Sequence, residues 1–352
     1  MVTNARGVLT LPRRSHPLVR AVAGQWRALT SPARARVRGA GEAVLVACSG
    51  GADSSALCVA LAAAQARFAV AHVVHDLREA AEAERDCEAA AALAQGVLAP
   101  FYFERVRVRE MRGNVEANAR RARYDALVSI ARQRGFGYVA TAHHAMDNLE
   151  SLLMTVARGG SLRALGGIRA RMRWPGSGVM IIRPMLAVSP TRARELCAEA
   201  GWTWAHDASN DDRSGDRVRS ALRHRVIPEL LEILPGAAQG AMRTSRLAAG
   251  AGAVVERAVR EAMRGADRAG APGELLRVER ARLAAMPGVL IGEVIRDAVR
   301  RGGVEGGGRA LSQRTLAAIS RVVRSSDTER RVFQLRGLDV VVDAREVCVR
   351  VV

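Results

Sequence analysis

The chain has 352 residues, of which 49% are hydrophobic and 25% are charged, so it is long enough for two domains with separate cores. Its apolar runs fall well short of the roughly 18 residues that a membrane span requires, which predicts a soluble protein without membrane contact. The formal net charge is +19, because 54 arginines and no lysine stand against 35 acidic residues, and this excess predicts a polyanionic partner such as nucleic acid.

Two stretches of the chain, residues 1–40 and 151–194, contain arginine but no acidic residue. RNA contact explains two such stretches better than chance does. The five cysteines form no C-x-x-C pair, which argues against zinc ribbons, iron–sulfur clusters and disulfide frameworks and fits a reducing cytoplasm. Residues 1–40 lack a signal-peptide pattern; we expect a first helix over residues 16–29 there, with an organelle transit peptide as the alternative.

Short apolar segments alternate with helical patterns up to about Pro235. The predicted strands are residues 43–48, 68–75, 101–108, 138–142 and 179–182. The predicted helices are residues 53–65, 78–95, 114–134, 146–157 and 191–200. This alternation predicts an α/β fold in which helices cover both faces of a parallel sheet, and ligands in such folds bind beyond the carboxyl ends of the strands.

The pattern changes after Pro235, where the chain becomes helical and rich in alanine and arginine. Two alternating apolar runs at residues 331–335 and 338–351 predict a terminal β segment, and a glycine-rich tract at residues 302–308 predicts a flexible joint. We therefore predict three parts: a basic N-terminal segment (1–40), a Rossmann-like catalytic domain (41–235) and a smaller helical domain that ends in the β segment (236–352).

A serine- and glycine-rich run, Ser49-Gly50-Gly51-Ala52-Asp53-Ser54, follows the first predicted strand and opens a helix. Backbone N–H groups at a helix N-terminus bind anions, and glycines allow a phosphate to approach them closely. An aspartate in a phosphate site is explained by a Mg²⁺ ion between carboxylate and phosphate. A Walker A loop is excluded because it needs a lysine, and an N-capped turn without function is the alternative.

This run matches SGGxDS, the loop of the N-type ATP pyrophosphatases, or PP-loop superfamily, in the same strand–loop–helix context. Those enzymes split ATP between the α and β phosphates and leave an adenylyl group on an oxygen. The resemblance implies that residues 49–54 bind ATP and that Asp53 is both a catalytic residue and the metal ligand. ATP and Mg²⁺ are therefore the expected cofactors.

Further segments resemble one branch of that superfamily, the tRNA(Ile)-lysidine synthetases. Six segments of the chain match, and the family's pattern for each is given in parentheses. They are residues 72–78 (HVDHGLR), 114–124 (centred on E-x-x-AR-x-x-RY), 143–151 (HHxxDxxET), 158–167 (RGxG…GL), 183–184 with 204–211 (RPLL and DxSN) and 219–228 (RNRIRHxVxP). The chain departs from these patterns at Val74, Asp76, Ser220 and Ala221. The resemblance is close over residues 42–235; beyond them only the order of helices followed by a β segment is similar.

Asp147 and Glu150 are the predicted catalytic partners of Asp53. They lie three residues apart at the start of a predicted helix, so they share a face where the helix dipole favours their charged forms. Two carboxylates beside a nucleotide loop can hold Mg²⁺ or a substrate ammonium, and both roles remain open. The predicted substrate-binding residues are His143, Arg120, Arg219 and Arg223.

The resemblance implies a cytoplasmic ligase that acts on an isoleucine tRNA with a CAU anticodon. ATP would adenylate O2 of the wobble cytidine, and free L-lysine would displace AMP from C2, giving lysidine and changing the codon read from AUG to AUA. Residues 236–352 would then bind tRNA.

One alternative is a tRNA thiolase of the same superfamily, which the absence of paired cysteines disfavours; another is a non-catalytic RNA-binding protein with a relic ATP pocket. The oligomeric state stays open, a homodimer included.

Overall fold

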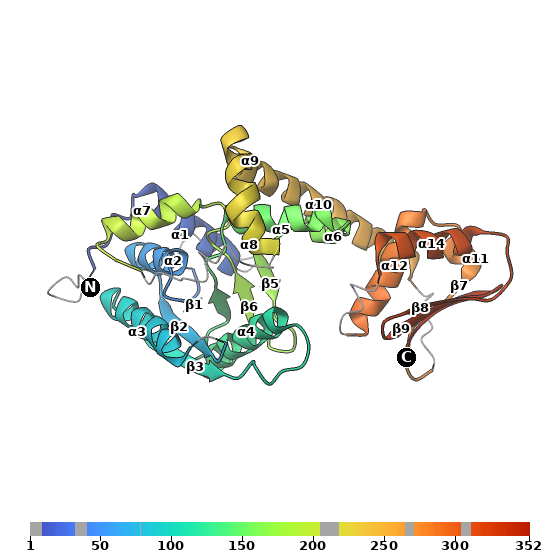
Figure 1. The fold of residues 1–352 in the computed structure, drawn as a ribbon, viewed down its shortest axis with the longest axis horizontal. Helices are drawn as coiled ribbons and strands as arrows, with labels where there is room; N and C mark the ends of the chain where they lie inside the picture. Colours follow the sequence, from blue (N-terminus) through green and yellow to red (C-terminus); the bar gives the residue numbers. More distant parts are fainter. Residues whose placement is uncertain (1–8, 32–40, 78, 205–217, 265–270, 304–310) are drawn as a thin grey trace. The chain divides into compact units, whose positions relative to one another are not determined.

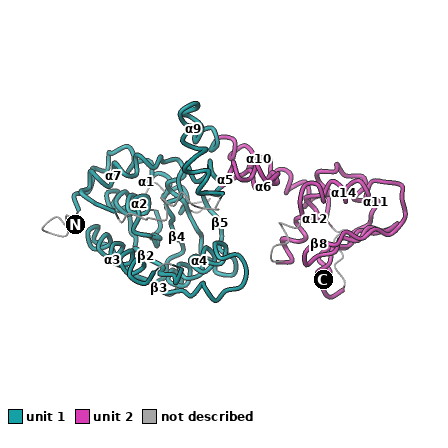
Figure 2. The backbone as a smooth tube through the Cα atoms, in the orientation of Figure 1, with its two compact units in different colours: residues 1–151, 168–242 teal, residues 152–167, 243–352 magenta. Residues whose placement is uncertain are grey.

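The computed structural model describes residues 9–31, 41–77, 79–204, 218–264, 271–303 and 311–352. Arg78, the DxSN resemblance from residue 205 onward, and residues 304–308 of the glycine-rich tract lie outside the described residues. The chain forms two compact units (Figure 2). Unit 1 comprises residues 1–151 and 168–242, and unit 2 comprises residues 152–167 and 243–352.

Unit 1 contains a six-stranded sheet in the order β3-β2-β1-β4-β6-β5 (Figure 1). The strands are β1 (Val44–Ala47), β2 (Phe68–His75), β3 (Phe101–Val106), β4 (Tyr138–Ala140), β5 (Arg171–Arg173) and β6 (Met180–Ile182). All neighbouring strands are parallel except β5, which runs antiparallel to β6 at the edge. The predicted parallel α/β sheet is confirmed. Ligands of such sheets bind beyond the carboxyl ends of the strands, so the site is expected at this edge.

The helices of unit 1 follow the strands in the expected alternation. They are α1 (Pro17–Thr30), α2 (Ala52–Ala63), α3 (Ala80–Gly96), α4 (Val115–Gln133), the start of α5 (Ala145–Ala157), α7 (Pro190–Glu199), α8 (Val218–Ala221), the π-helical segment η2 (Leu222–Val226), α9 (Ile227–Ile233) and the start of α10 (Ala237–Ala262). Asn114 caps α4, because its side chain accepts a hydrogen bond from the Ala117 N–H.

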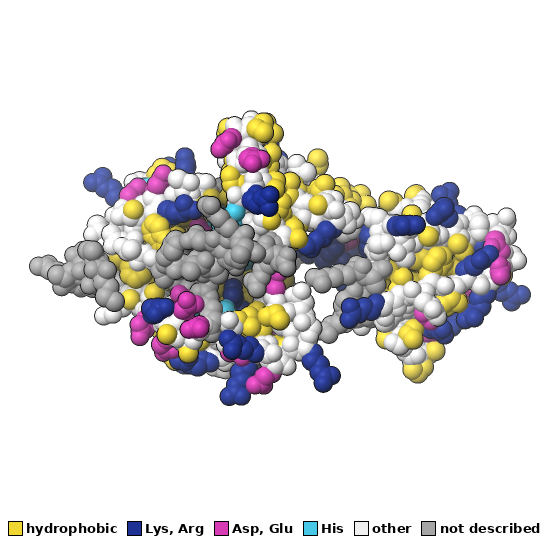
Figure 3. Space-filling view, viewed as in Figure 1, with side chains coloured by type: hydrophobic (Ala, Val, Ile, Leu, Met, Phe, Trp, Pro, Cys, Tyr) yellow, Lys and Arg dark blue, Asp and Glu magenta, His cyan; other side chains and the backbone are white. Residues whose placement is uncertain are grey.

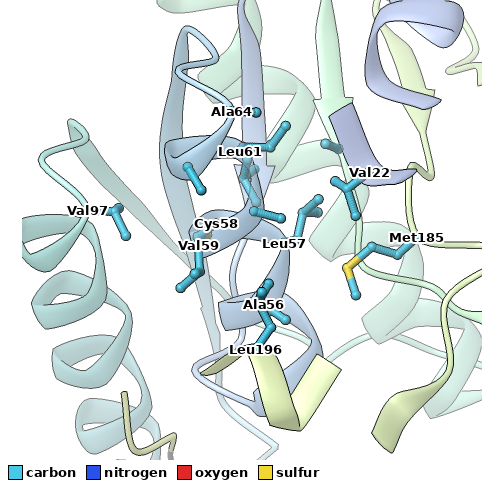
Figure 4. Packing of buried hydrophobic residues seen from close by; sticks show 14 of the residues in the cluster. Val22, Ala56, Leu57, Cys58, Val59, Leu61, Ala64, Val97, Met185 and Leu196 are labelled. Carbon is cyan, nitrogen blue, oxygen red and sulfur yellow. The ribbon is translucent and has the colours of Figure 1, made fainter. Parts of the chain in front are cut away.

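Successive residues of each strand face opposite sides of the sheet, and helices cover both. Val44 and Val46 of β1 pack in the cluster formed with α1, α2, α3 and α7, part of which Figure 4 shows around Leu57, Leu61 and Leu196. Leu45 faces the other way, into a cluster with α4. Near-continuous apolar strands such as β1 and β2 are what burial on both faces requires.

Unit 2 has its own core between helices and a four-stranded antiparallel sheet in the order β7-β10-β9-β8. Its elements, apart from the ends of α5 and α10, are α6 (Leu162–Leu165), β7 (Glu274–Glu279), α11 (Arg280–Ala284), α12 (Gly288–Arg301), α14 (Gln313–Arg324), β8 (Arg331–Leu335), β9 (Leu338–Val342) and β10 (Glu346–Val351). Among the described residues, no helix combines the length and apolar character that crossing a membrane requires.

Candidate active site

The phosphate loop connects β1 to α2 at the carboxyl edge of the sheet. Gly50 has φ of 83°, a left-handed conformation that favours glycine. The buried Ser54 hydroxyl accepts a hydrogen bond from the Ser49 N–H at 3.2 Å and donates to the Gly51 carbonyl oxygen at 3.0 Å. This hydroxyl therefore fixes the loop against the first turn of α2.

His72 of β2 holds the backbone just before this loop. Its Nδ1 lies 2.8 Å from the Cys48 carbonyl oxygen, and its side chain is buried. Because β1 and β2 are neighbouring parallel strands, this bond ties the end of β1, from which the loop leaves, to the middle of β2. The sequence placed His72 in a family-like segment but assigned it no role.

Asp53, in the first turn of α2, meets the start of α5 through His144. His144 Nε2 lies 3.4 Å from Asp53 Oδ2, and His144 Nδ1 lies 3.3 Å from Asp147 Oδ2. The His144 backbone N–H also donates to Asp147 Oδ2 at 2.8 Å. Burial lowers the pKa of His144, but the Asp53 and Asp147 carboxylates outweigh it and raise that pKa above its ordinary value. The His144 ring thus lies between two carboxylates, one near each of its nitrogens.

Glu150 lies one turn further along α5 and pairs with Arg223. Arg223 Nε donates to Oε1 at 2.7 Å and Nη2 donates to Oε2 at 3.1 Å, so the contact is bidentate. Arg223 Nη2 also lies 3.7 Å from Asp147 Oδ1. The Glu150 side chain is only 5% exposed, and Arg223 compensates its buried charge. Arg223 belongs to η2, and single π-helical turns are frequent at functional sites.

His143 lies among arginines instead of carboxylates. Its Nδ1 is 2.9 Å from Thr141 Oγ1. Burial, followed by the positive charges of Arg183, Arg120 and Arg219, lowers the pKa of His143 to about 3, so its imidazole is neutral at neutral pH. The predicted site residues thus form two adjacent groups: Asp53, Asp147, Glu150 and Arg223 in one, and His143 with Arg120 and Arg219 in the other.

The donor set at Asp53 fits a divalent cation. Asp53 Oδ1 is buried and has no hydrogen-bond partner within the described part of the chain. The same residues contain no group of three or more His, Cys, Asp or Glu side chains that could hold a metal by themselves. Mg²⁺ commonly takes one or two carboxylates and completes its coordination with phosphate oxygens and water. Asp53 would hold Mg²⁺ in this way beside the phosphate loop.

Two departures from the family pattern have structural explanations. Val74 of β2 is buried against Ala83 and Cys87 of α3. The Asp76 carboxylate accepts hydrogen bonds from the backbone N–H groups of Val108 at 2.7 Å and Arg109 at 3.3 Å, which lower its pKa. Asp76 therefore joins the loop after β2 to the segment after β3.

This combination of sheet, loop and carboxylates defines a PP-loop domain, and the family of that description matches residues 27–230. The tRNA(Ile)-lysidine synthases of Salinispora arenicola and Salinispora tropica are 38% and 39% identical over 211 residues, 58% of this chain and 62% of each relative. That of a Methylobacterium species is 34% identical over 266 residues, 73% of both chains. The chain belongs to the tRNA(Ile)-lysidine synthase family.

A solved structure adds support for the fold. The U34-tRNA thiolase NcsA from Methanococcus maripaludis superposes with a TM-score of 0.50 at 14% identity, over 66% of this chain and 78% of that one. This similarity concerns the fold alone. The matched region spans less than two thirds of the Salinispora relatives.

Proposed function

We propose that this protein joins free L-lysine to C2 of the wobble cytidine, position 34, of an isoleucine tRNA with a CAU anticodon, consuming ATP and releasing AMP and diphosphate. The supporting observation is the convergence of Asp53, on the phosphate loop, with Asp147 through His144, at 3.4 and 3.3 Å. A nucleotide loop and a carboxylate site for an amine are thereby adjacent. Family membership supports the same reaction.

The first half-reaction uses the loop. The α2 N-terminus and the Ser49 hydroxyl would hold the ATP phosphates on the loop that Ser54 fixes, and bound Mg²⁺ would supply charge neutralisation on them. Cytidine O2 attacks the α-phosphate and diphosphate leaves. Asp53 keeps one buried oxygen without a hydrogen-bond partner among the described residues, so it would hold the cation beside the loop.

The second half-reaction uses the carboxylates of α5. The lysine ε-ammonium first loses a proton to solvent; the free amine then attacks C2, the C2–O2 bond breaks and AMP leaves with that oxygen. The Asp147 side chain is 22% exposed, so a substrate ammonium could reach it, whereas Glu150 is already bound by Arg223 on both oxygens. Asp147 would orient the amine directly. Glu150 would hold Arg223, which also lies near Asp147, and would in this way help to position Asp147.

The charge of the chain suits a tRNA partner. Figure 3 shows dark-blue arginine side chains over the visible face of both units. Arginine contacts to phosphate release counterions, which favours binding of a polyanion. We propose that unit 2 contributes to tRNA binding, and a cytoplasmic location follows from a tRNA substrate.

The test is incorporation of radiolabelled lysine into an unmodified CAU-anticodon isoleucine tRNA with ATP and Mg²⁺. We expect incorporation by the wild-type protein and a loss of at least about 100-fold in Asp53→Ala, because the metal ligand is removed. Glu82→Ala is the matched control, since Glu82 is an acidic residue in the first turn of α3 and outside the site.

Two other outcomes would contradict the proposal in different ways. Formation of AMP that depends on tRNA, without lysine incorporation, would keep the adenylation step but require another nucleophile, as in a thiolase. If neither AMP nor labelled RNA is formed, the protein would instead be a binding protein with a relic ATP pocket.

A further inference from the structure

Arg183 is a buried cation that has no acidic partner within the described part of the chain. It follows β6 directly and is 3% exposed. Its guanidinium donates to the Arg169 carbonyl oxygen at 2.6 Å and to the Tyr124 hydroxyl at 3.3 Å, while its buried Nε has no partner among the described residues. Burying a charge is costly unless an opposite charge compensates it. An anion that is not part of the described chain would supply that compensation.

The sheet register places Arg183 beside His143. Ala140 of β4 pairs with Ile182 of β6, so Thr141 and Arg183 are the next pair along the carboxyl edge. Both side chains face α4, because Val139 and Ile181, two residues earlier on each strand, pack against that helix. Thr141 in turn contacts His143 Nδ1 at 2.9 Å. The pairing of β4 with β6 therefore places Arg183 next to Thr141, the residue that contacts His143.

Two exposed arginines reach the same place from α4 and α8. The Arg120 guanidinium lies 5.2 Å from the ring centroid of Tyr124, whose hydroxyl binds Arg183. Arg219 Nη1 contacts Glu116 Oε1 at 3.0 Å, and Glu116 lies one turn before Arg120 on α4. Arg120, Arg183 and Arg219 also act together on His143, since all three charges lower its pKa. We call these three residues the arginine cluster.

We propose that the arginine cluster is a second anion site, separate from the phosphate loop, and that it binds a phosphodiester of the RNA backbone beside the reacting base. This inference rests on the proposed function for its RNA substrate. The exposed Arg120 and Arg219 would contact the phosphate oxygens. The positive charge of the buried Arg183 would attract the same phosphate without touching it, and the low dielectric around Arg183 strengthens that attraction. The cluster faces α4, whereas α2 covers the opposite side of the sheet, so the ATP phosphates occupy a different place.

The test compares Arg120→Gln with Arg132→Gln in the full-length protein. Both substitutions remove one exposed arginine from α4, but Arg132 lies in its last turn, at the far edge of the sheet. We expect Arg120→Gln to weaken tRNA binding roughly tenfold, as loss of a charged hydrogen bond does. We also expect the slope of log Kd against log salt, between about 50 and about 200 mM, to fall by about 0.7 to 0.9. Arg132→Gln should change neither value.

Equal tRNA affinity and salt slope in the two variants would overturn the site while leaving the proposed reaction in place. A raised KM for lysine with unchanged tRNA binding would overturn it too, because the anion would then be the lysine carboxylate. Absence of tRNA binding by the wild-type protein would instead refute the proposed function.

Arg183→Met provides a second measurement, made only on protein that retains the wild-type circular dichroism spectrum. It removes the buried charge without introducing a new one, so the affinity for tRNA should fall as it does in Arg120→Gln. Unchanged affinity for tRNA in folded Arg183→Met would exclude Arg183 from the site.

Discussion

At the residue scale, the two adjacent histidines just before α5 have pKa values shifted in opposite directions because their neighbours differ. His143 is surrounded by arginines, and burial together with those charges lowers its pKa to about 3. His144 lies between Asp53 and Asp147, which raise its pKa in spite of burial. Two consecutive histidines thus have pKa values shifted in opposite directions in adjacent parts of one site.

This difference predicts how stability depends on pH. An unfolded His143 takes up a proton near its ordinary pKa of about 6.5, whereas the folded one does so only at about 3. The unfolded state therefore binds more protons in this range, and the free energy of unfolding falls as pH drops from about 6.5 towards about 3. His143→Gln should flatten this dependence, measured by urea denaturation at several pH values.

His144 affects a different pH range. Its folded pKa is raised, so its contribution is fully present below about pH 6.5 and is lost as pH rises through the folded value. The contributions of the two histidines can therefore be separated by pH.

The outcome that would contradict the His143 prediction is an equal slope of unfolding free energy against pH, below about pH 6.5, in the wild-type and His143→Gln proteins. It would show that the fold does not hold His143 neutral.

The Glu150–Arg223 pair makes a second prediction at this scale. Arg223→Met leaves a carboxylate that is 5% exposed without its cation, which should lower the free energy of unfolding. We expect about 1 to 2 kcal/mol, at the low end for a buried pair because Arg223 itself is 44% exposed. In a double-mutant cycle, Glu150→Gln should recover part of this loss in the Arg223→Met background; strictly additive effects would argue against the pair.

At the element scale, hydrophobic period and turn residues predicted most of unit 1. Strand β2 at residues 68–75 and strand β8 at residues 331–335 have the predicted bounds, and the other long elements differ by a few residues at their ends. The run at residues 338–351 was predicted as one segment and forms two strands. The Asp343 carboxylate accepts hydrogen bonds from the Arg345 and Glu346 N–H groups and makes the turn between them.

Features that depend on tertiary contacts were missed. Strand β5 has three residues with two exposed arginines, so no apolar period marks it, and β7 was also absent from the prediction. Motifs predicted Asp53, Asp147 and Glu150, and the structure places these carboxylates near one another. The position of Arg183 next to Thr141 depends on the register between β4 and β6, and the contacts of His144 depend on the phosphate loop lying beside the start of α5. A single sequence shows neither arrangement.

Arg280, at the start of α11, shows how one side chain fixes several elements of unit 2. It is 6% exposed, and among the described residues its guanidinium donates to one hydroxyl and five backbone carbonyl oxygens, all uncharged. The carbonyls belong to Val322, Val323, Ser325, Asp327 and Asp343. Two of them belong to the last turn of α14, where helical carbonyls lack intrahelical partners.

Arg280→Met should therefore lower the free energy of unfolding of unit 2 by on the order of 3 kcal/mol, since several buried acceptors lose their donor. Thermal denaturation followed by circular dichroism measures the loss. Arg282→Met is the control, because Arg282 also donates to backbone carbonyls but at an exposed position. A loss no larger than the control's would mean that water replaces the guanidinium.

At the scale of the whole molecule, the two units have separate hydrophobic cores. The clusters around α2 and around α4 belong to unit 1, and the cluster formed by β7, β9, β10, α12 and α14 belongs to unit 2. A domain with its own core can unfold as its own cooperative unit. The phosphate loop lies entirely in unit 1, so a nucleotide that binds it should stabilise that unit.

Differential scanning calorimetry should therefore resolve two transitions that respond to different changes. A non-hydrolysable ATP analogue with Mg²⁺, at about 100 times its Kd, should stabilise one transition by about 2.7 kcal/mol, because ligand binding to the native state adds this free energy. Arg280→Met should lower the other transition alone. If the analogue and the substitution shift the same transition by comparable amounts, the units unfold together and their cores are not energetically independent.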